Sequence, residues 1–275
     1  MSKKQQTIFI LSISSDIGMA IAQRYLESGH RVIGTYRSKK IIQQVQDHPF
    51  CHLINCDLTQ KDSIFKLFEE YQRLKFSWDV FISCPCELRP LTPFFQGDFE
   101  QWSESMHVNV IEQLRVLHGL HPYRNKSGVC DIVFFAAGGV NNAVVDFSAY
   151  TASKNMLIKM CEYLDAENAD LNIFIVGPGW TKTKVLDVFL SNKDVPKQKQ
   201  EEISDFLQNR NGTSMQDIFD CIEWLRAKGK AIASGRNFSV VHDKWKGAAS
   251  QYLAKALMED SGMYKLKRHR NDWRP

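Results

Sequence analysis

Short apolar runs alternate with longer segments of helical periodicity along most of the chain. Runs of four to six largely apolar residues, bounded by polar residues, predict buried strands. These predicted strands are Thr7–Leu11, 31–35, 52–55, Val80–Ser83, 131–136 and 172–176.

The segments between the strands place apolar residues on one face at helical spacing. In the first of them Ile17, Ile21 and Tyr25 share a face, and Gly29 follows where a helix C-terminus favours glycine. Unbroken alternation of strand and helix predicts a doubly wound α/β domain, with a parallel sheet and helices on both faces. The predicted helices cover 17–27, Lys61–Leu74, 100–120 and 153–167.

The segment 181–213 interrupts this alternation with polar and charged residues and little strand character. We expect a mobile insertion over the sheet there. A helix, Met215–Lys228, and a strand, 238–241, follow and return to the same core. The sequence therefore predicts a single domain over residues 1–275, with a C-terminal tail over about 246–275.

The composition is that of a soluble globular protein. Of 275 residues, 44% are hydrophobic and 24% are charged, which excludes disordered and collagen-like chains. Seven cysteines, an odd number without the spacing of a disulfide-stapled domain, favour reduced thiols and a cytoplasmic location. No apolar stretch approaches the length that spans a bilayer, so we expect no membrane span. Only 15 residues are glycine, which is few for a nucleotide-binding protein.

The end of the first strand carries small and hydroxylated residues that continue into a predicted helix. Such residues let backbone N–H groups approach a pyrophosphate, and a helix N-terminus favours an anion. A helix capped by serine or aspartate accounts for the same residues without any ligand. The residues of this candidate cofactor turn are Ser12, Ser14, Ser15, Asp16, Ile17 and Gly18.

Arg37 follows the second strand, where dinucleotide-binding proteins distinguish their cofactors. An acidic residue there binds the ribose 2′-hydroxyl of NAD, whereas an arginine accommodates the 2′-phosphate of NADP. The stretch after this strand contains Arg37, Lys39 and Lys40 and no carboxylate. It favours NADP(H) over NAD(H), although a solvated turn with ordinary charges has the same composition.

Tyr150 and Lys154 form the strongest candidate for catalysis. Four residues apart, they lie on the same side of a helix. A free tyrosine has a pKa of about 10 and transfers protons poorly near neutrality. A nearby ammonium stabilises the phenolate and lowers that pKa. The pair can therefore act as acid and base when a carbonyl is reduced or an alcohol is oxidised.

Together these motifs resemble the short-chain dehydrogenase/reductase family over about residues 6–245. The resemblance implies a Rossmann-like fold, a catalytic Tyr150 and Lys154, and a helix residue, Asn109, that supports the lysine through a water. It also implies that Asp57 contacts the adenine ring and that Thr181 helps to hold the nicotinamide amide. The cofactor contacts implied by the resemblance are Asp57, Leu58, Ser83, Tyr150, Lys154, Pro178, Gly179 and Thr181.

The chain departs from the family pattern at several positions. Ser12 and Asp16 stand where two glycines of the cofactor turn are expected. The family's NNAG motif is replaced by the sequence SCPC, residues 83–86. The serine that hydrogen-bonds the substrate carbonyl falls at Ala136 or Ala137, and its loss removes a few kcal/mol of transition-state stabilisation, by analogy with an oxyanion donor.

Three explanations for the absent serine remain open. Asn141 or Asn142 donates the hydrogen bond instead, since an amide can donate to an oxygen; a turn at a strand exit accounts for the two asparagines equally well. Alternatively, the enzyme is slow and acts on an activated carbonyl. The third explanation is a catalytically impaired protein that binds nucleotide, or serves as a scaffold, without turnover.

The expected function is an NADP(H)-dependent oxidoreductase that interconverts a carbonyl and an alcohol on a polar, sugar-related small molecule. The segment after Pro178 and Gly179, which includes the lid over 181–213, contains Trp180, Phe189 and Phe206 among many Lys, Glu and Gln residues, which suggests a polar or semi-polar substrate. The C-terminal sequence resembles that of bacterial relatives with roles in sugar metabolism. The resemblance implies a homodimer or homotetramer formed by the helices 100–120 and 153–167. The basic run 264–270 is too short to predict a nucleic-acid partner, and we expect no metal at the Cys-Pro-Cys sequence.

Overall fold

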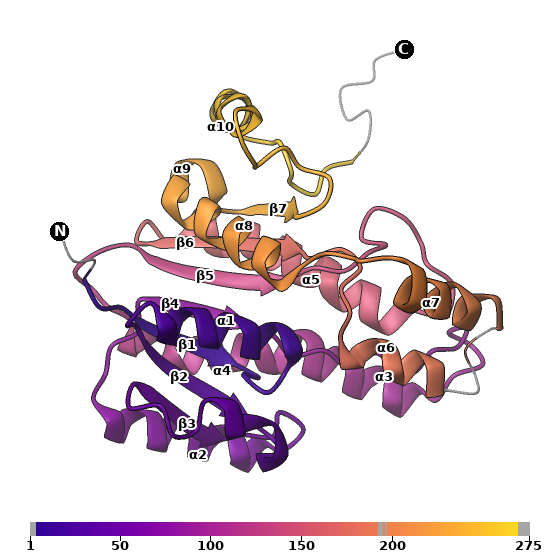
Figure 1. The fold of residues 1–275 in the computed structure, drawn as a ribbon, viewed down its shortest axis with the longest axis horizontal. Coiled ribbons are helices and arrows are strands. Elements are labelled where there is room, and N and C mark those ends of the chain that lie inside the picture. The colour runs from indigo at the N-terminus through magenta and orange to yellow at the C-terminus, as the bar shows by residue number, and fades with distance from the viewer. Residues whose placement is uncertain (1–3, 192–194, 196, 269–275) are drawn as a thin grey trace.

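The computed structural model describes residues 4–191, 195 and 197–268. Within this part of the chain, seven parallel strands form one sheet in the order β3-β2-β1-β4-β5-β6-β7 (Figure 1). The order reverses between β1 and β4, and doubly wound sheets bind ligands beyond this point. The strands are β1 (Thr7–Leu11), β2 (Arg31–Tyr36), β3 (Cys51–Asn55), β4 (Val80–Ser83), β5 (Cys130–Phe135), β6 (Leu171–Gly177) and β7 (Arg236–Ser239).

Helices cover both faces of the sheet, which confirms the predicted doubly wound architecture. Ile8 and Ile10 of β1 enter the core beneath α1, α8 and α10, whereas Phe9 and Leu11 enter the core beneath α2, α4 and α5. Because both faces are buried, the strands appear in the sequence as continuous apolar runs. The helices are α1 (Asp16–Glu27), α2 (Lys61–Leu74), α3 (Phe99–Met106), α4 (Glu112–Leu120), α5 (Ser148–Glu167), α6 (Lys184–Ser191), α7 (Lys197–Asn209), α8 (Met215–Lys228), α9 (Lys230–Ala233) and α10 (Ala249–Glu259).

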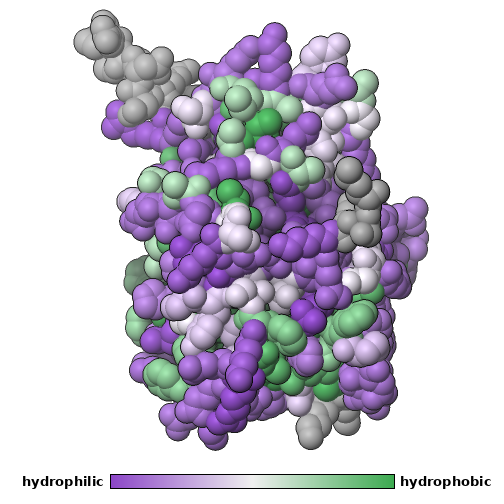
Figure 2. All heavy atoms as spheres, turned by 90° about the vertical axis from the view of Figure 1, so that its left-hand side faces the viewer, coloured by the Kyte–Doolittle hydropathy of each residue, from purple (hydrophilic) through white to green (hydrophobic). Residues whose placement is uncertain are grey.

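The two ends of the sheet differ in what surrounds them. The surface at the amino ends of the strands is largely hydrophilic, with small, separate apolar patches (Figure 2). The helices α3, α6 and α7 lie at the opposite end, beyond the carboxyl ends of the strands (Figure 1). Among the described helices, none is both long and apolar enough to cross a membrane.

The helix predicted over 100–120 is interrupted by one π-helical turn, His107–Ile111, between α3 and α4. The side-chain amide of Gln113 donates to the carbonyl oxygens of Asn109 and Val108 at 2.8 and 3.2 Å. A side chain that enters the backbone ladder in this way widens the turn. Asn109 therefore sits at an irregular point of the helix and is fully buried there.

The lid forms two helices that the sequence analysis did not predict. Phe189 of α6 and Ile203 of α7 are buried, and both pack with Leu88, Leu91 and the partly buried Tyr150. The apolar residues of the lid recur at helical spacing, but the many charged residues between them obscured this pattern in the sequence. Positions 192–194 and 196 of the predicted lid, and residues 269–275 of the predicted tail, lie outside the described residues.

The predicted tail contributes a helix to the core. Leu253 and Leu257 of α10 pack into the same cluster as α1 and α8. The buried guanidinium of Arg236 in β7 donates to the carbonyl oxygens of Leu257 at 2.7 Å and Asp260 at 3.1 Å, and also to that of Ile232. One arginine thus caps the C-terminal ends of both α9 and α10 and holds them against the edge of the sheet.

A buried ionic network joins α8 to the amino end of the sheet. Arg226 donates to Asp131 of β5 at 2.8 Å and forms an ion pair with Glu223. The hydroxyl of Tyr25 in α1 donates to Glu223 at 2.6 Å. Burial raises the pKa of Asp131, and the Arg226 charge opposes that rise.

We expect Arg226→Met to lower the free energy of unfolding by about 3–5 kcal/mol, because it leaves the buried Asp131 carboxylate unpaired. The variant's deficit should shrink as the pH falls, since Asp131, whose folded pKa lies above its unfolded value, then takes up a proton. Urea denaturation followed by circular dichroism measures both effects. Arg73→Met, which removes an exposed ion pair with Glu69, is the control and should change stability by less than about 1 kcal/mol. A deficit that the double variant Arg226→Met/Asp131→Asn does not reduce would contradict this explanation.

Candidate active site

Tyr150 and Lys154 lie one turn apart near the start of α5, beyond the carboxyl end of β5. The Lys154 ammonium is 5.6 Å from the centre of the Tyr150 ring, and the lysine is only 3% exposed. Burial lowers the pKa of Lys154. Burial also raises the pKa of Tyr150, and its contact with Cys86 raises it further. In the free protein, burial thus shifts the pKa of Tyr150 in the direction opposite to that expected from a nearby ammonium, and the lowering by Lys154 stays a prediction.

Asn109 lies in the π-helical turn, where its side chain holds the loop that follows β4. Its amide oxygen accepts from the backbone N–H of Glu87 at 2.8 Å, and its amide nitrogen donates to the Glu87 carbonyl at 2.6 Å. The amide nitrogen also donates to the Ser105 hydroxyl at 3.1 Å. Asn109 thus fixes the loop in front of α5, and its support of Lys154 through a water stays a prediction.

Gln113 is a residue of this site that the sequence analysis missed. Besides the Asn109 carbonyl, its amide donates to the carbonyl of Pro85 at 3.3 Å, and its oxygen accepts from the Ser83 hydroxyl at 2.8 Å. The Ser83 side chain, an expected cofactor contact, is therefore engaged inside the protein. A polar residue on the apolar face of the predicted helix, between Val110 and Val116, was the available signal.

The cofactor turn joins β1 to α1 in a conformation that a glycine normally provides. Ser12 has a φ of +64°, and its N–H donates to the Thr35 hydroxyl at 2.8 Å. Ser15 caps α1 by accepting from the N–H of Gly18 at 3.0 Å. A Cβ atom at Gly18 would lie 2.7 Å from the Ser12 carbonyl oxygen, so that position requires glycine. The close turn survives although only one of its three expected glycines remains.

The first turn of α1 still presents unsatisfied N–H groups to a ligand. Ser15 satisfies the N–H of Gly18, whereas those of Asp16 and Ile17 have no acceptor within the helix. Ser14 precedes this cap at the same strand exit and is half-buried. These groups and the helix dipole fit the pyrophosphate of a dinucleotide.

Asp16 connects the cofactor turn to the lid. Its carboxylate accepts from the backbone N–H of Lys184 at 2.7 Å and lies 3.4 Å from the ammonium of the same residue. The first residue of α6 is thereby held at the N-terminus of α1, where its cation partly offsets the aspartate charge. Lys184 was not among the predicted site residues, because nothing in the sequence brings positions 16 and 184 together.

The strand exits of β2 and β3 form the expected adenosine end. Arg37 is exposed just after β2, and the Asn55 amide of β3 donates to its carbonyl at 3.4 Å. Asp57 accepts from both the N–H and the hydroxyl of Thr59, at 3.0 and 2.9 Å, and so shapes the turn into α2. Leu58 packs against the core beneath α2. The exposed guanidinium near this edge fits a 2′-phosphate.

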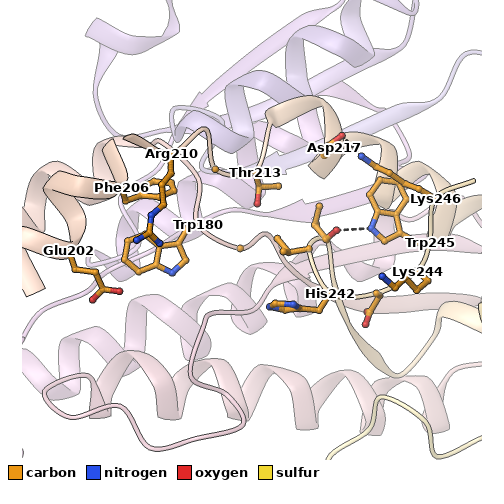
Figure 3. A pocket seen from close by; sticks show the side chains of 15 residues that line it. Trp180, Glu202, Phe206, Arg210, Thr213, Asp217, His242, Lys244, Trp245 and Lys246 are labelled. Atoms are coloured by element: carbon orange, nitrogen blue, oxygen red, sulfur yellow. Dashed lines mark hydrogen bonds and ion pairs between the residues drawn. The ribbon is translucent and has the colours of Figure 1, made fainter. Parts of the chain in front are cut away.

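The exit of β6 runs through Pro178 and Gly179, which has a φ of +75°. Thr181 is buried and its hydroxyl donates to the Gly179 carbonyl at 3.3 Å. A cavity of about 680 Å³ adjoins this exit, between α7 and the loop after β7 (Figure 3). Trp180 meets the Phe206 ring edge-on there, with 4.9 Å between centroids. The cavity is also lined by Glu202, Arg210, Thr213, Asp217, His242, Lys244, Trp245 and Lys246.

Among the hydrogen bonds of the described residues, none joins the expected serine substitutes to Tyr150. Ala136 is buried at the end of β5, and Asn141 and Asn142 are exposed in a turn whose N–H to carbonyl hydrogen bond joins Asn142 to Gly139 at 3.2 Å. The two asparagines therefore form the turn at a strand exit that was the alternative explanation for them. The side chain that influences the pKa of Tyr150 is instead Cys86, on the loop after β4.

The described residues contain no group of three or more His, Cys, Asp or Glu side chains placed to hold a metal ion. Cys84 and Cys86 of the Cys-Pro-Cys sequence instead lie beside Lys154, which influences the pKa of both thiols.

Comparison with known proteins agrees with this geometry. A family model described as Enoyl-(Acyl carrier protein) reductase matches residues 13–241. The chain belongs to the short-chain dehydrogenase/reductase family. A relative in this family, the 3-oxoacyl-(acyl-carrier-protein) reductase FabG of Buchnera aphidicola, is 24% identical over 249 residues, which cover 87% of this chain and 97% of that protein.

Solved structures of the short-chain dehydrogenase/reductase family share the fold. The KRED1-Pglu enzyme superimposes with a TM-score of 0.76 at 18% identity, covering 85% of this chain and 100% of that one. A short-chain dehydrogenase from Shigella flexneri complexed with NADP gives a TM-score of 0.71 at 20% identity, covering 86% and 96%. Members of the family are oxidoreductases that use NAD(P).

The strained cofactor turn generates a stability prediction. We expect Ser12→Gly to raise the free energy of unfolding by about 0.5–1 kcal/mol, because glycine adopts a positive φ without the steric cost that serine bears. Ser28→Gly is the matched control: Ser28 has a φ of −84°, so glycine there should stabilise nothing. Chemical denaturation gives the free energy of unfolding of both variants. If Ser12→Gly is no more stable than Ser28→Gly, the proposed strain at Ser12 is contradicted.

Proposed function

We propose that the chain is an NADP(H)-dependent oxidoreductase that interconverts a carbonyl and an alcohol. The observation that carries the proposal is the pair of a partly buried Tyr150 and a buried Lys154, which lies beneath the lid at the same end of the sheet as the cofactor turn. The name of the Buchnera relative, a 3-oxoacyl reductase, supports the reductive direction.

The residues at the strand exits would hold the cofactor. The N-terminus of α1 would bind the pyrophosphate, Arg37 the 2′-phosphate, and Thr181 the nicotinamide amide. When bound, the nicotinamide supplies the hydride that reaches the carbonyl carbon. Asp57 and Leu58 would flank the adenine at the end of β3.

Tyr150 is the proposed proton donor. The raised pKa of its hydroxyl keeps it protonated at neutral pH, which suits donation to the oxygen of a carbonyl under reduction. The positive charge of Lys154 would stabilise the phenolate that remains after the transfer. Asn109 holds the β4 loop against this pair. The family resemblance further implies that Asn109 supports Lys154 through a bridging water.

The proposed substrate presents an apolar part to Tyr150. The charged lid residues that suggested a polar substrate, such as Lys182 and Glu201, lie on the exposed side of the lid. On the inner side, Phe189 and Leu91 pack in the cluster that contains Tyr150. We therefore propose a ketone or aldehyde with an apolar chain or ring beside the reacting carbonyl.

A catalytically impaired nucleotide-binding protein is the second candidate. Ala136 and Ala137 in place of the serine favour it. NADPH binding without reduction of any carbonyl in a broad panel would support this candidate over the first. As in other members of the family, the proposed assembly is a homodimer or homotetramer through α4 and α5.

Tyr150→Phe should lower kcat by about 100-fold or more, because it removes the proton donor. The dissociation constant for NADPH should change by less than about threefold, since the aromatic ring remains. The assay follows NADPH absorbance with ethyl acetoacetate and benzil as carbonyl probes. Tyr252→Phe, an exposed tyrosine of α10, is the matched control and should keep wild-type turnover. Wild-type kcat in Tyr150→Phe would refute the mechanism.

Arg37→Ala should weaken NADPH binding about 10- to 100-fold, because a charged hydrogen bond to the 2′-phosphate is worth about 1.5–3 kcal/mol. NADH binding should be unchanged. Energy transfer from tryptophan to the reduced nicotinamide measures both titrations, with the exposed Arg73→Ala as control. Equal affinity of the wild-type protein for NADPH and NADH would argue against a 2′-phosphate site.

A further inference from the structure

The loop after β4 is held so firmly that it gives Cys86 a defined position. The N–H of Cys84 donates to the Leu11 carbonyl at 3.0 Å, which continues the pairing of β4 with β1. On the other side of Pro85, whose carbonyl accepts from Gln113, both backbone groups of Glu87 are bonded to the Asn109 side chain. Cys86 therefore lies between two clamped residues.

The Cys86 thiol faces the catalytic pair from this loop. Leu88, two residues farther along this loop, packs in one cluster with Tyr150, which places the loop against the pair. In keeping with this placement, the Cys86 thiol is electrostatically coupled to Tyr150 and to Lys154. Cys86 is also exposed to solvent, whereas its neighbour Cys84 is buried. The exposed thiol is thus accessible to a ligand that approaches Tyr150.

At the positions where the family resemblance places a second hydrogen-bond donor for a substrate oxygen, this chain has no hydroxyl. The positions expected to carry a serine are Ala136 and Ala137, and Asn141 and Asn142 are exposed in their own turn. A thiol is a weak donor as well as a weak acceptor. A carbonyl oxygen placed between Cys86 and Tyr150 would replace the contact between the two side chains with one hydrogen bond to each.

We propose that the Cys86 thiol donates a hydrogen bond to the substrate carbonyl oxygen and so performs, from the opposite loop, the task of the absent serine. The proposal rests on the proposed carbonyl reduction. As the hydride of NADPH adds to the carbon, the C=O electron pair moves to the oxygen. That oxygen takes the Tyr150 proton, while Cys86 keeps its own proton and releases none.

The ionisation of the thiol agrees with a donor rather than a nucleophile. Although one side of Cys86 is exposed, protein surrounds the rest of the residue, and this partial desolvation raises its pKa. The Glu87 carboxylate adds to the rise, whereas Lys154 and Tyr150 oppose it. A thiol with a raised pKa keeps its proton at neutral pH. A donor must be protonated, whereas a nucleophilic cysteine must not be.

The test compares Cys86→Ala with Cys86→Ser in the NADPH assay with ethyl acetoacetate and benzil. Cys86→Ala should lower kcat about 10- to 100-fold, a smaller loss than that of a full oxyanion donor because sulfur donates weakly. Cys86→Ser restores a donor and should keep kcat within about threefold of wild type or exceed it. NADPH affinity should not change in either variant. Cys51→Ala, a half-buried thiol on β3, is the matched control and should behave as wild type.

A second readout uses alkylation by N-ethylmaleimide, with peptide mass spectrometry to locate the adduct. Modification of Cys86 should abolish turnover of the wild-type protein and leave Cys86→Ser active. Equal inactivation of both proteins would overturn the proposal. So would wild-type kcat in Cys86→Ala, or a Cys86→Ser variant as slow as Cys86→Ala.

The outcomes separate this proposal from the function on which it rests. If Tyr150→Phe is inactive and Cys86→Ala retains full turnover, carbonyl reduction stands and the role of Cys86 is refuted. If the wild-type protein binds NADPH but reduces no carbonyl, both proposals are refuted. Thermal unfolding of Cys86→Ala should match wild type, because the side chain is exposed.

Discussion

Parallel strands are joined by crossovers, so the carboxyl ends of β1 to β7 all lie at the same end of the sheet. Both faces of the sheet are covered by helices, which leaves this end as the place where loops from distant parts of the sequence can meet. Every residue assigned to the candidate site, from Ser12 after β1 to Thr181 after β6, lies at such an exit or on the helix that follows it. The site is therefore a direct consequence of two-sided burial of the sheet.

At that end of the sheet, the π-helical turn of residues 107–111 organises the catalytic side. It buries Asn109 and Gln113 and directs their amides onto the β4 loop, which in turn presents Cys86 to Tyr150. The two buried amides are satisfied by backbone N–H and carbonyl groups and by serine hydroxyls around this loop, so each amide is held in one orientation. On the opposite side, Asp16 holds the start of the lid through Lys184. Two places where the chain departs from the family pattern, Asp16 and the loop 83–86, thus have specific hydrogen-bond partners in this structure.

Desolvation governs the electrostatics of the pair under the lid. Phe189 and Leu91 exclude water around Tyr150, which raises the pKa of the tyrosine, while burial lowers the pKa of Lys154. A neutral, protonated hydroxyl next to a protonated thiol is an environment that donates hydrogen bonds. Such a pair suits an incoming carbonyl oxygen better than it suits an anionic substrate.

The sequence by itself determined the sheet, most of its covering helices and the candidate catalytic pair. Continuous apolar runs such as Thr7–Leu11 and the four-residue spacing of Tyr150 and Lys154 are local signals, because strand burial and helix periodicity act within a few residues. The low glycine count was likewise traceable to Ser12, Asp16 and Cys86. Only the tertiary structure showed that Ser12 adopts the glycine-like conformation and that the lid is helical with an apolar inner face.

Contacts between positions far apart in the chain were not predictable from one sequence. The pairs Asp16–Lys184, Asn109–Glu87 and Cys86–Tyr150 depend on which strand exits become neighbours, and on the path of each loop between them. Local pattern carries no information about that path, since short polar segments satisfy many conformations equally well. For the same reason the sequence predicted that a donor was missing beside Tyr150, whereas only the folded chain placed the Cys86 thiol there.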